Sequence, residues 1–271
     1  MNSGFVTPHR VINRVGIHQR FDTAAFHMIA RYLPTHGFPT LKDIVYFEGY
    51  NGPDGLKVKS PGVNEPSHLY DPINDKGEVP LHITNHYAGL VRSIQAGDRI
   101  RGAFEASWLA HYICDGLTPA HHWPLEAKVA EAASDALDDI AADTSRFTAT
   151  LKKYWAVWGV KGHMSTHFYF ESGIALALMS YPIRATYSDD ELAKARQLGA
   201  LEYFKAEARN IAALDLYERF YVQGWSPEIL NALKNQIAPL TARTIGMIWL
   251  LAVLEAGEEL ALDASAAAEK S

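Results

Sequence analysis

Three short segments of this sequence carry histidines and carboxylates at spacings that suit a metal site. In "AHYICDGLTPAHHW", His111 and Asp115 lie four residues apart, and His121 follows six residues later. A helix of about 3.6 residues per turn would place His111 and Asp115 on one face, one turn apart. In "STHFYFESG", His167 and Glu171 repeat the four-residue spacing. Imidazole and carboxylate groups are common ligands of divalent metal ions, so these residues predict metal chemistry.

A third donor, His68, lies in "EPSHLYDP". One histidine–carboxylate pair alone is most often a surface ion pair or a satisfied hydrogen bond in the core. Two such pairs in apolar segments are costly to bury unless another group compensates their carboxylates. A divalent ion would compensate both pairs, and the extra histidines favour it. Because the chain has a single cysteine, Cys114, such a site must be built from imidazole and carboxylate groups.

The segments that carry these residues have sequence patterns that predict helices separated by turns. Helical patterns cover roughly residues 19–33, 81–96, 98–114, 168–179, 189–221 and 227–262. We find no strand alternation of any length and no internal repeat. The pattern therefore predicts an all-α fold in one helical domain, residues 1–262, with inserted helices at about 124–158. Residues 263–271 are expected to form a disordered tail.

His68 lies in a segment of different character. Residues 47–80 are dense in proline and glycine, which argues against a continuous helix there. A loop of this length within a compact domain usually serves a functional site. We therefore expect a long ordered Pro/Gly-rich loop that carries His68 toward the other ligands.

Composition and charge limit the partners of the protein. The chain has 271 residues, 48% of them hydrophobic and 21% charged, and a net charge of −6. This acidic balance argues against stable binding of duplex nucleic acid. The most apolar run, residues 245–254, is about half of the ~20 residues that cross a bilayer, so we expect a buried helix and no transmembrane segment. The first residues lack the apolar run of a signal peptide, which predicts a cytoplasmic protein, or a secreted or periplasmic one if a signal was removed.

At these motifs the sequence resembles a known family. "HYICDGLTPAHH" is similar to the His-Tyr-x-x-Asp-x-x-x-Pro-x-His signature of the zinc-dependent phospholipase C family, whose fold is shared by fungal single-strand-specific nucleases. His167 and Glu171 match a His-x-x-x-acid pair that follows the signature in that family. His68 in "SHLYDP" matches an upstream ligand, and His18 in "GIHQRFDTAAF" matches a histidine that opens the first long helix. The resemblance covers about residues 16 to 175.

The resemblance implies the phospholipase C fold and a cluster of two or three zinc ions. By this resemblance His68, His111 and Asp115 would hold one zinc. Asp115 would also bridge to a third ion at His18. Family members complete the third site with an N-terminal tryptophan that this sequence lacks, so we expect that site to be incomplete or to use another donor such as His9.

The second zinc and the catalytic acid are assigned in the same way. The resemblance implies that His121, His167 and Glu171 hold the second zinc. The family has a further acid in the loop, some fourteen residues before the position of His68. Asp54 lies at that distance and is our candidate for the general base or for a carboxylate behind the metal ligands.

The resemblance implies a metal-dependent hydrolase that activates water for attack on a phosphodiester. The expected substrate is a phospholipid or another phosphate ester. A single-strand nuclease or 3′-nucleotidase on the same metal core is the first alternative; it would need aromatic stacking positions, for which Tyr70, Phe168 and Tyr169 are the candidates. A helical protein that kept the ligands with lost or altered activity is the second alternative.

Overall fold

In this computed structural model, residues 16–33, 37–53, 68–122 and 163–268 are described. That part of the chain is mostly helical, which confirms the all-α class. Its elements, in chain order, are α1 (Ile17–Ile29), η1 (Ala30–Tyr32), α2 (Leu41–Asn51), β1 (Tyr70–Asp71), β2 (Lys76–Gly77), α3 (Val79–Gln95), α4 (Arg99–Gly116), α5 (Pro119–His122), α8 (His163–Leu178), α9 (Asp189–Ala212), α10 (Leu216–Gln223), α11 (Pro227–Ala232), η2 (Leu233–Ile237) and α12 (Ala238–Ala268). The two short strands pair antiparallel, Tyr70 with Gly77 and Asp71 with Lys76.

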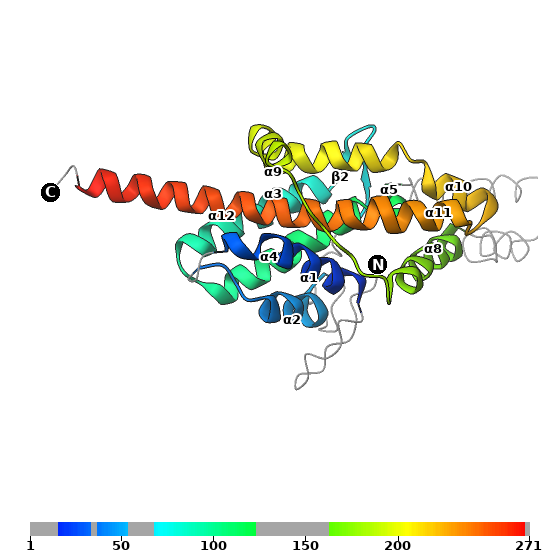
Figure 1. The fold of residues 1–271 in the computed structure, drawn as a ribbon, viewed down its shortest axis with the longest axis horizontal. Helices are drawn as coiled ribbons and strands as arrows, with labels where there is room; N and C mark the ends of the chain where they lie inside the picture. Colours follow the sequence, from blue (N-terminus) through cyan, green and yellow to red (C-terminus); the bar gives the residue numbers. More distant parts are fainter. Residues whose placement is uncertain (1–15, 34–36, 54–67, 123–162, 269–271) are drawn as a thin grey trace, which may run out of the picture.

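The long helix α12 forms the centre of the bundle and packs against α1, α3, α4 and α9 (Figure 1). Trp249 in α12 is fully buried, and its indole Nε1–H donates to the Ala106 carbonyl of α4 at 3.2 Å. Within the described part of the chain, the helical run Pro227–Gly257 is long and apolar enough to cross a membrane by length and composition. An 18-residue window of this run has a mean hydropathy of 1.7, and 72% of that window is buried inside the structure. The run therefore forms part of the core of the bundle.

The helices α3 and α4 pack against each other and carry part of the site. The Asp98 side chain begins α4 by accepting a hydrogen bond from the Arg101 backbone N–H at 3.0 Å, as an N-cap does. The turn before it uses Gly97 in the left-handed region, at φ +66°. From Gly102 onward most side chains of α4 are buried, so His111 and Asp115 lie inside the protein.

Several expected boundaries differ from those observed. Helix α2 was not predicted, and its last residues lie in the expected loop at 47–80, of which the structure describes residues 47–53 and 68–80. The expected helix at 189–221 is two helices, because Asp215 adopts a left-handed backbone at φ 51°. Helix α12 continues to Ala268, past the expected end of the domain at 262, because the last residues are rich in alanine, a strong helix former, and contain no proline. The expected inserted helices at 124–158 lie outside the described residues.

An extended segment joins α8 to α9. Residues 182–188 are irregular, and Figure 1 shows this connection crossing the face of the bundle close to α1. Ile183, Ala185 and Tyr187 pack against the core, whereas Pro182 and the other intervening side chains are exposed. This alternation is the period of two that an extended chain produces. This alternation was not predicted from the sequence, because the segment is too short to give a clear pattern.

Candidate metal centre

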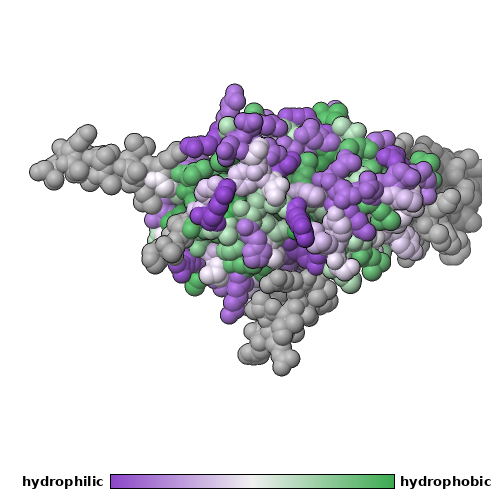
Figure 2. All heavy atoms as spheres, viewed as in Figure 1, coloured by the Kyte–Doolittle hydropathy of each residue, from purple (hydrophilic) through white to green (hydrophobic). Residues whose placement is uncertain are grey.

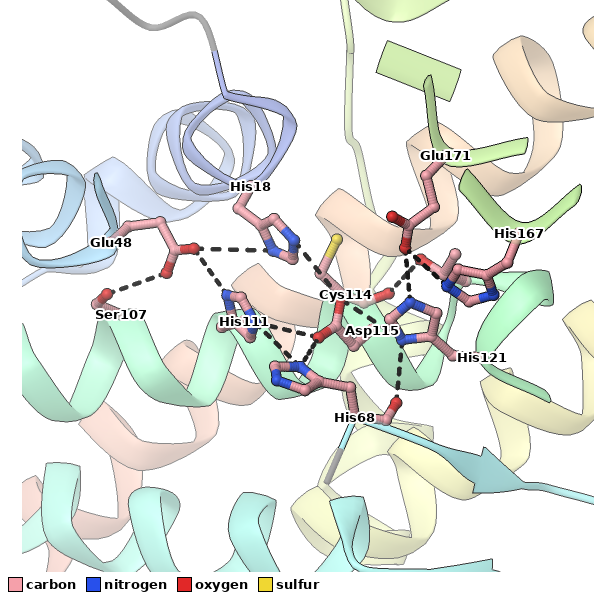
Figure 3. Close-up of polar contacts among 11 residues, drawn as sticks. His18, Glu48, His68, Ser107, His111, Cys114, Asp115, His121, His167 and Glu171 are labelled. Atoms are coloured by element: carbon pink, nitrogen blue, oxygen red, sulfur yellow. Dashed lines mark hydrogen bonds and ion pairs between the residues drawn. The ribbon is translucent and has the colours of Figure 1, made fainter. Parts of the chain in front are cut away.

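Eight potential metal ligands from six places in the chain meet at one centre (Figure 3). They come from α1, α2, the residue two positions before β1, α4, α5 and α8. The eight are His18, Glu48, His68, His111, Asp115, His121, His167 and Glu171. They form three overlapping or adjacent groups, and within each group the ligand atoms lie within 4.8 Å of one another. These groups could each hold a metal ion.

The first group consists of His68, His111 and Asp115, the residues assigned by resemblance to the first zinc. Asp115 Oδ2 lies 2.5 Å from His68 Nδ1 and 3.1 Å from His111 Nε2. The helical spacing of His111 and Asp115 on α4 therefore brings both side chains to the same point, as predicted. His68 reaches them from the chain just before the β1–β2 hairpin.

The second group consists of His121, His167 and Glu171, the residues assigned to the second zinc. Glu171 Oε1 lies 2.9 Å from His121 Nε2 and 3.3 Å from His167 Nε2. The His121 Nδ1–H donates to the His68 carbonyl at 3.0 Å, which turns Nε2 toward Glu171. Both His167 and Glu171 come from one face of α8, as their spacing predicted.

Asp115 lies between the groups. Its second oxygen, Oδ1, is 3.5 Å from His18 Nε2 and 3.7 Å from His121 Nδ1. One carboxylate therefore faces His68 and His111 with one oxygen and His18 of α1 with the other, while the His121 nitrogen near it is the Nδ1 that donates to the His68 carbonyl. This position suits a carboxylate that bridges two metal ions.

The third group contains Glu48, which sequence reasoning missed. Glu48, His18 and His111 are all buried, and Glu48 Oε1 accepts a hydrogen bond from His111 Nδ1–H at 2.8 Å. Ser107 donates its hydroxyl to Glu48 Oε2 at 3.1 Å. Glu48 could have been identified from the sequence as a buried carboxylate, because it follows the apolar Ile44 by one helical turn on the same face of α2. A carboxylate on a buried apolar face needs partners, and here it has two imidazoles and a hydroxyl.

Asp22 was missed although it repeats the pattern used elsewhere. It follows His18 by four residues on α1, and both side chains are 1% exposed. Burial, and after it the nearby Glu48 carboxylate, raise the pKa of Asp22 well above its ordinary value. Its Oδ2 is buried without a hydrogen-bond partner. The chain thus has three His-x-x-x-acid pairs at one centre.

The electrostatics of the centre favour ligands in their metal-binding forms. Burial lowers the pKa of His18 to about 4, with a further contribution from His111, so His18 is neutral at neutral pH. Burial would raise the pKa of Asp115, but His111 and His121 lower it well below its usual range. For Glu171, too, hydrogen bonds from His121 and His167 outweigh burial and lower the pKa. Asp115 and Glu171 are therefore ionised and can coordinate a cation.

The pKa of His111 is shifted in the opposite direction from that of His18. Burial alone would lower its pKa, but the carboxylates of Asp115 and Glu48 raise it well above the ordinary value. The two buried carboxylates beside it therefore favour the positive charge of the protonated imidazole despite its burial. A divalent ion supplies that charge instead, and its binding would displace the proton from His111 Nε2.

The donor set fits a divalent metal ion. The ligands are imidazole nitrogens and carboxylate oxygens, and His167 Nδ1 is a further buried nitrogen without a hydrogen-bond partner. Cys114 lies beside the centre (Figure 3), but burial raises the pKa of its thiol well above its ordinary value. The thiol therefore stays protonated and is a poor ligand.

The centre is closed at one end and open at the other. His18, Glu48, His111 and Asp115 are at most 1% exposed. In contrast, the side chains of His68 and Glu171 are 24% and 22% exposed. A small molecule can therefore reach the centre only past His68 and α8 within the described part of the chain.

The remaining predicted residues lie at different places. Asp54 and the alternative donor His9 are outside the described residues. Tyr70 is buried against Phe204, and its hydroxyl donates to Asp75 at 2.8 Å, so its ring supports the hairpin. Phe168 and Tyr169 are exposed on α8, next to His167.

Comparisons with protein-family models, with curated proteins and with solved structures find no match for this chain.

Proposed function

We propose that this protein is a metal-dependent phosphodiester hydrolase of the zinc-dependent phospholipase C type, with a cluster of two or three zinc ions. One observation carries the proposal: two three-residue ligand groups lie at one centre, and Asp115 of the first group also turns its second carboxylate oxygen toward His18 Nε2 at 3.5 Å. Adjacent metal sites joined by a carboxylate are typical of enzymes that cleave phosphate esters. Both groups consist of the residues that the resemblance to that family assigns to its zinc ions.

The side chains of the centre have distinct tasks in this proposal. Glu48 accepts the Nδ1 proton of His111 and the His68 carbonyl accepts that of His121, so both imidazoles present Nε2 to the ions. Bound zinc ions would lower the pKa of a water molecule and neutralise the non-bridging phosphate oxygens. We assign the orientation of the attacking water to Asp54, as the resemblance implies.

The open end of the centre indicates how a substrate enters. The phosphate group would approach past His68 and Glu171, the more exposed ligands. Phe168 and Tyr169 are 65% and 56% exposed on the same helix as Glu171. Their rings could contact either the apolar part of a phospholipid or the bases of a single strand. The proposed substrate is a phospholipid or related phosphate ester, and a single strand is the alternative.

The first test measures bound metal by mass spectrometry after dialysis against metal-free buffer. We expect two or three equivalents of zinc in the wild type and fewer in Asp115→Asn and in His167→Ala. His27→Ala is the matched control, since His27 is an exposed histidine on α1 outside the centre, and it should retain the full content. A wild-type protein that binds no metal even when zinc is supplied would refute the proposal.

The second test separates the substrate classes. Zinc-loaded protein is assayed against a phosphocholine ester and against single-stranded DNA, with Asp115→Asn as the negative control. Hydrolysis of the ester supports the phospholipase C proposal. Cleavage of DNA alone would favour the nuclease. Inactivity toward both substrates with zinc bound would favour a family member with lost or altered activity.

A further inference from the structure

A pocket of about 500 Å³ lies between α1 and the extended segment 182–188, away from the metal centre. On α1 it is lined by side chains that include Arg20, His27 and Met28; on the extended segment it is lined by others that include Ile183 and Arg184. Figure 2 shows this side of the molecule, where apolar side chains lie among strongly hydrophilic ones. The volume is within the range of small-molecule sites, which is about 300–1,000 Å³.

The pocket and the metal centre use opposite faces of the same helix. His18 and Asp22 are buried on the face of α1 that is turned to the metal centre. Arg20, Thr23 and His27 follow at spacings that place them on the other side of a helix with about 3.6 residues per turn. A ligand in this pocket would therefore not touch the metal ligands.

Two arginines of the pocket have no anionic partner among the residues that the structure describes. Arg20 donates from Nη2 to the Tyr181 carbonyl at 2.5 Å, and its Nε is buried with no hydrogen-bond partner. Within the described parts of the chain, no carboxylate lies within ion-pair distance of Arg20 or Arg184. A buried guanidinium N–H without an acceptor is unfavourable, and a bound anion would satisfy it. Within the described residues, the two arginines beside this pocket thus have no carboxylate partner, although the chain has a net charge of −6.

Apart from Thr23, His27 and Thr186, the rest of the lining is apolar. Met28 and Ala24 on α1, and Ile183 and Pro182 on the extended segment, contribute hydrocarbon surface. A ligand that used the whole pocket would therefore carry both a negative charge and an apolar body. Inorganic phosphate would satisfy only the arginines and leave this surface in water.

We propose that this pocket is a binding site for an organic anion, in which Arg20 and Arg184 bind a phosphate or carboxylate head and Met28 and Ile183 contact a short apolar body. Arginine is well suited to this task, because its guanidinium group can donate two parallel hydrogen bonds to such a head. The inference does not depend on the proposed hydrolase activity.

The test is calorimetric titration of the full chain with hexyl phosphate, hexanoate and inorganic phosphate. We expect one equivalent of hexyl phosphate or hexanoate to bind at the pocket, more tightly than inorganic phosphate does. Arg184→Gln should weaken that binding at least tenfold, because it removes a charged donor from the pocket. Arg92→Gln is the matched control, since Arg92 is an exposed arginine of α3 that does not line the pocket, and it should change the affinity less than twofold.

Asp115→Asn distinguishes the pocket from the metal centre, which also attracts phosphate. Binding that is unchanged in Arg184→Gln but lost in Asp115→Asn would place the anion at the metal centre and overturn the inference. The absence of any binding of hexyl phosphate or hexanoate at millimolar concentration would overturn it as well. Circular dichroism and the bound metal content verify that Arg184→Gln is folded.

Discussion

Glu48 determines which nitrogen of His111 faces the metal centre. An imidazole in its neutral form carries one proton, and a carboxylate that accepts this proton at Nδ1 leaves the Nε2 lone pair free. The Glu48–His111 pair is buried, and Ser107 holds the second Glu48 oxygen in place. The orientation of His111 is therefore set before a metal ion binds, which reduces the cost of ordering the site.

At the residue scale, we expect Glu48→Gln to lower zinc affinity about 10- to 100-fold, as changes to such carboxylate–histidine pairs usually do. The glutamine keeps the size and an acceptor oxygen but removes the negative charge beside His111. The affinity is measured by competition with a chromogenic chelator. Ser107→Ala, which leaves the Glu48–His111 hydrogen bond intact, should lose much less. An unchanged affinity in Glu48→Gln would show that Glu48 has no part in metal binding.

The sequence indicated which residues meet in the structure where two of them lie one helical turn apart, and did not where a residue stands alone in its segment. The pairs His111/Asp115 and His167/Glu171 could be recognised because a helix converts a spacing of four into a shared face. Glu48 stands alone in its segment, and only the packing of α2 against α4 brings it to His111. His18 and Asp22 have the same four-residue spacing as these two pairs and could have been recognised from the sequence.

At the element scale, the position of α8 depends on a glycine. Helix α8 packs through Phe170 against Trp225, whose rings stack at a centroid distance of 5.2 Å. A Cβ at Gly173 would overlap the Trp225 indole. The absence of a side chain at Gly173 thus allows the close approach that places His167 and Glu171 at the centre.

We therefore expect Gly173→Ala to reduce the free energy of unfolding by about 1–3 kcal/mol through overpacking. The displaced helix should also bind less zinc at His121, His167 and Glu171. Thermal unfolding and metal content measure the two effects. Gly257→Ala is the matched control, because a Cβ there meets no atom within 4 Å and should be neutral or stabilising. Equal behaviour of the two variants would show that the contact with Trp225 does not position α8.

Helices α3 and α4 are joined by a buried polar network around Glu105. The Glu105 side chain accepts hydrogen bonds from His86 Nδ1–H at 2.6 Å and from Arg101 Nε–H at 2.7 Å. Burial would raise the pKa of Glu105, but the contacts with His86 and Arg101 lower it below its ordinary value of 4.5. The folded protein thus keeps this carboxylate ionised at a pH where the unfolded chain already binds a proton. Its contribution to stability is complete above pH 4.5 and is lost as the pH falls through the lowered pKa.

Accordingly, Glu105→Gln should lose about 1.5–3 kcal/mol of stability at neutral pH, the usual contribution of hydrogen bonds to a charged group. The difference from the wild type should shrink as the pH falls below 4.5. Denaturant unfolding at a series of pH values measures both. Glu255→Gln, at an exposed glutamate that accepts from Tyr87, should stay close to the wild type throughout. A difference that does not depend on pH would contradict this explanation.

Helices were predicted close to their observed bounds where one continuous stretch of sequence carries the apolar pattern of a helix. The helices α3, α4 and α8 follow apolar patterns, and their observed bounds lie within a few residues of those expected. Helix α2 was missed because Gly49 and Gly52 near its end resemble loop residues. The separation of α9 from α10 was also missed, since Asp215 adopts a left-handed backbone without a glycine or proline to announce it.

At the scale of the whole molecule, the metal centre connects elements that are far apart in the chain. Its ligands come from α1, α2, α4, α5 and α8 as well as from the residue His68. Without a bound ion, the buried carboxylates of α2 and α4 depend on His111 to compensate their charge. A bound ion should therefore stabilise the entire bundle and not only the site.

We expect removal of metal by a chelator to lower Tm by on the order of 10 °C. A ligand at about a thousand times its Kd contributes about 4 kcal/mol, and about 1 kcal/mol corresponds to roughly 2–4 °C in a chain of this size. Addition of zinc should restore the Tm, which scanning calorimetry can follow. Asp115→Asn should respond less to the chelator. A Tm that the chelator leaves unchanged in the wild type would contradict a structural contribution of the metal.

The single cysteine gives this protein a built-in reporter of its own motions. Cys114 is 1% exposed and directly precedes Asp115 on α4. A thiol reagent can modify it only in molecules whose interior has opened, so the labelling rate measures the free energy of that opening. Zinc should slow labelling if the ion locks the helices together, and hexyl phosphate in the α1 pocket should slow it if that pocket is coupled to the interior. The labelling rate of this natural cysteine thus compares how strongly zinc and hexyl phosphate, bound at two separate sites, suppress opening of the same helical bundle.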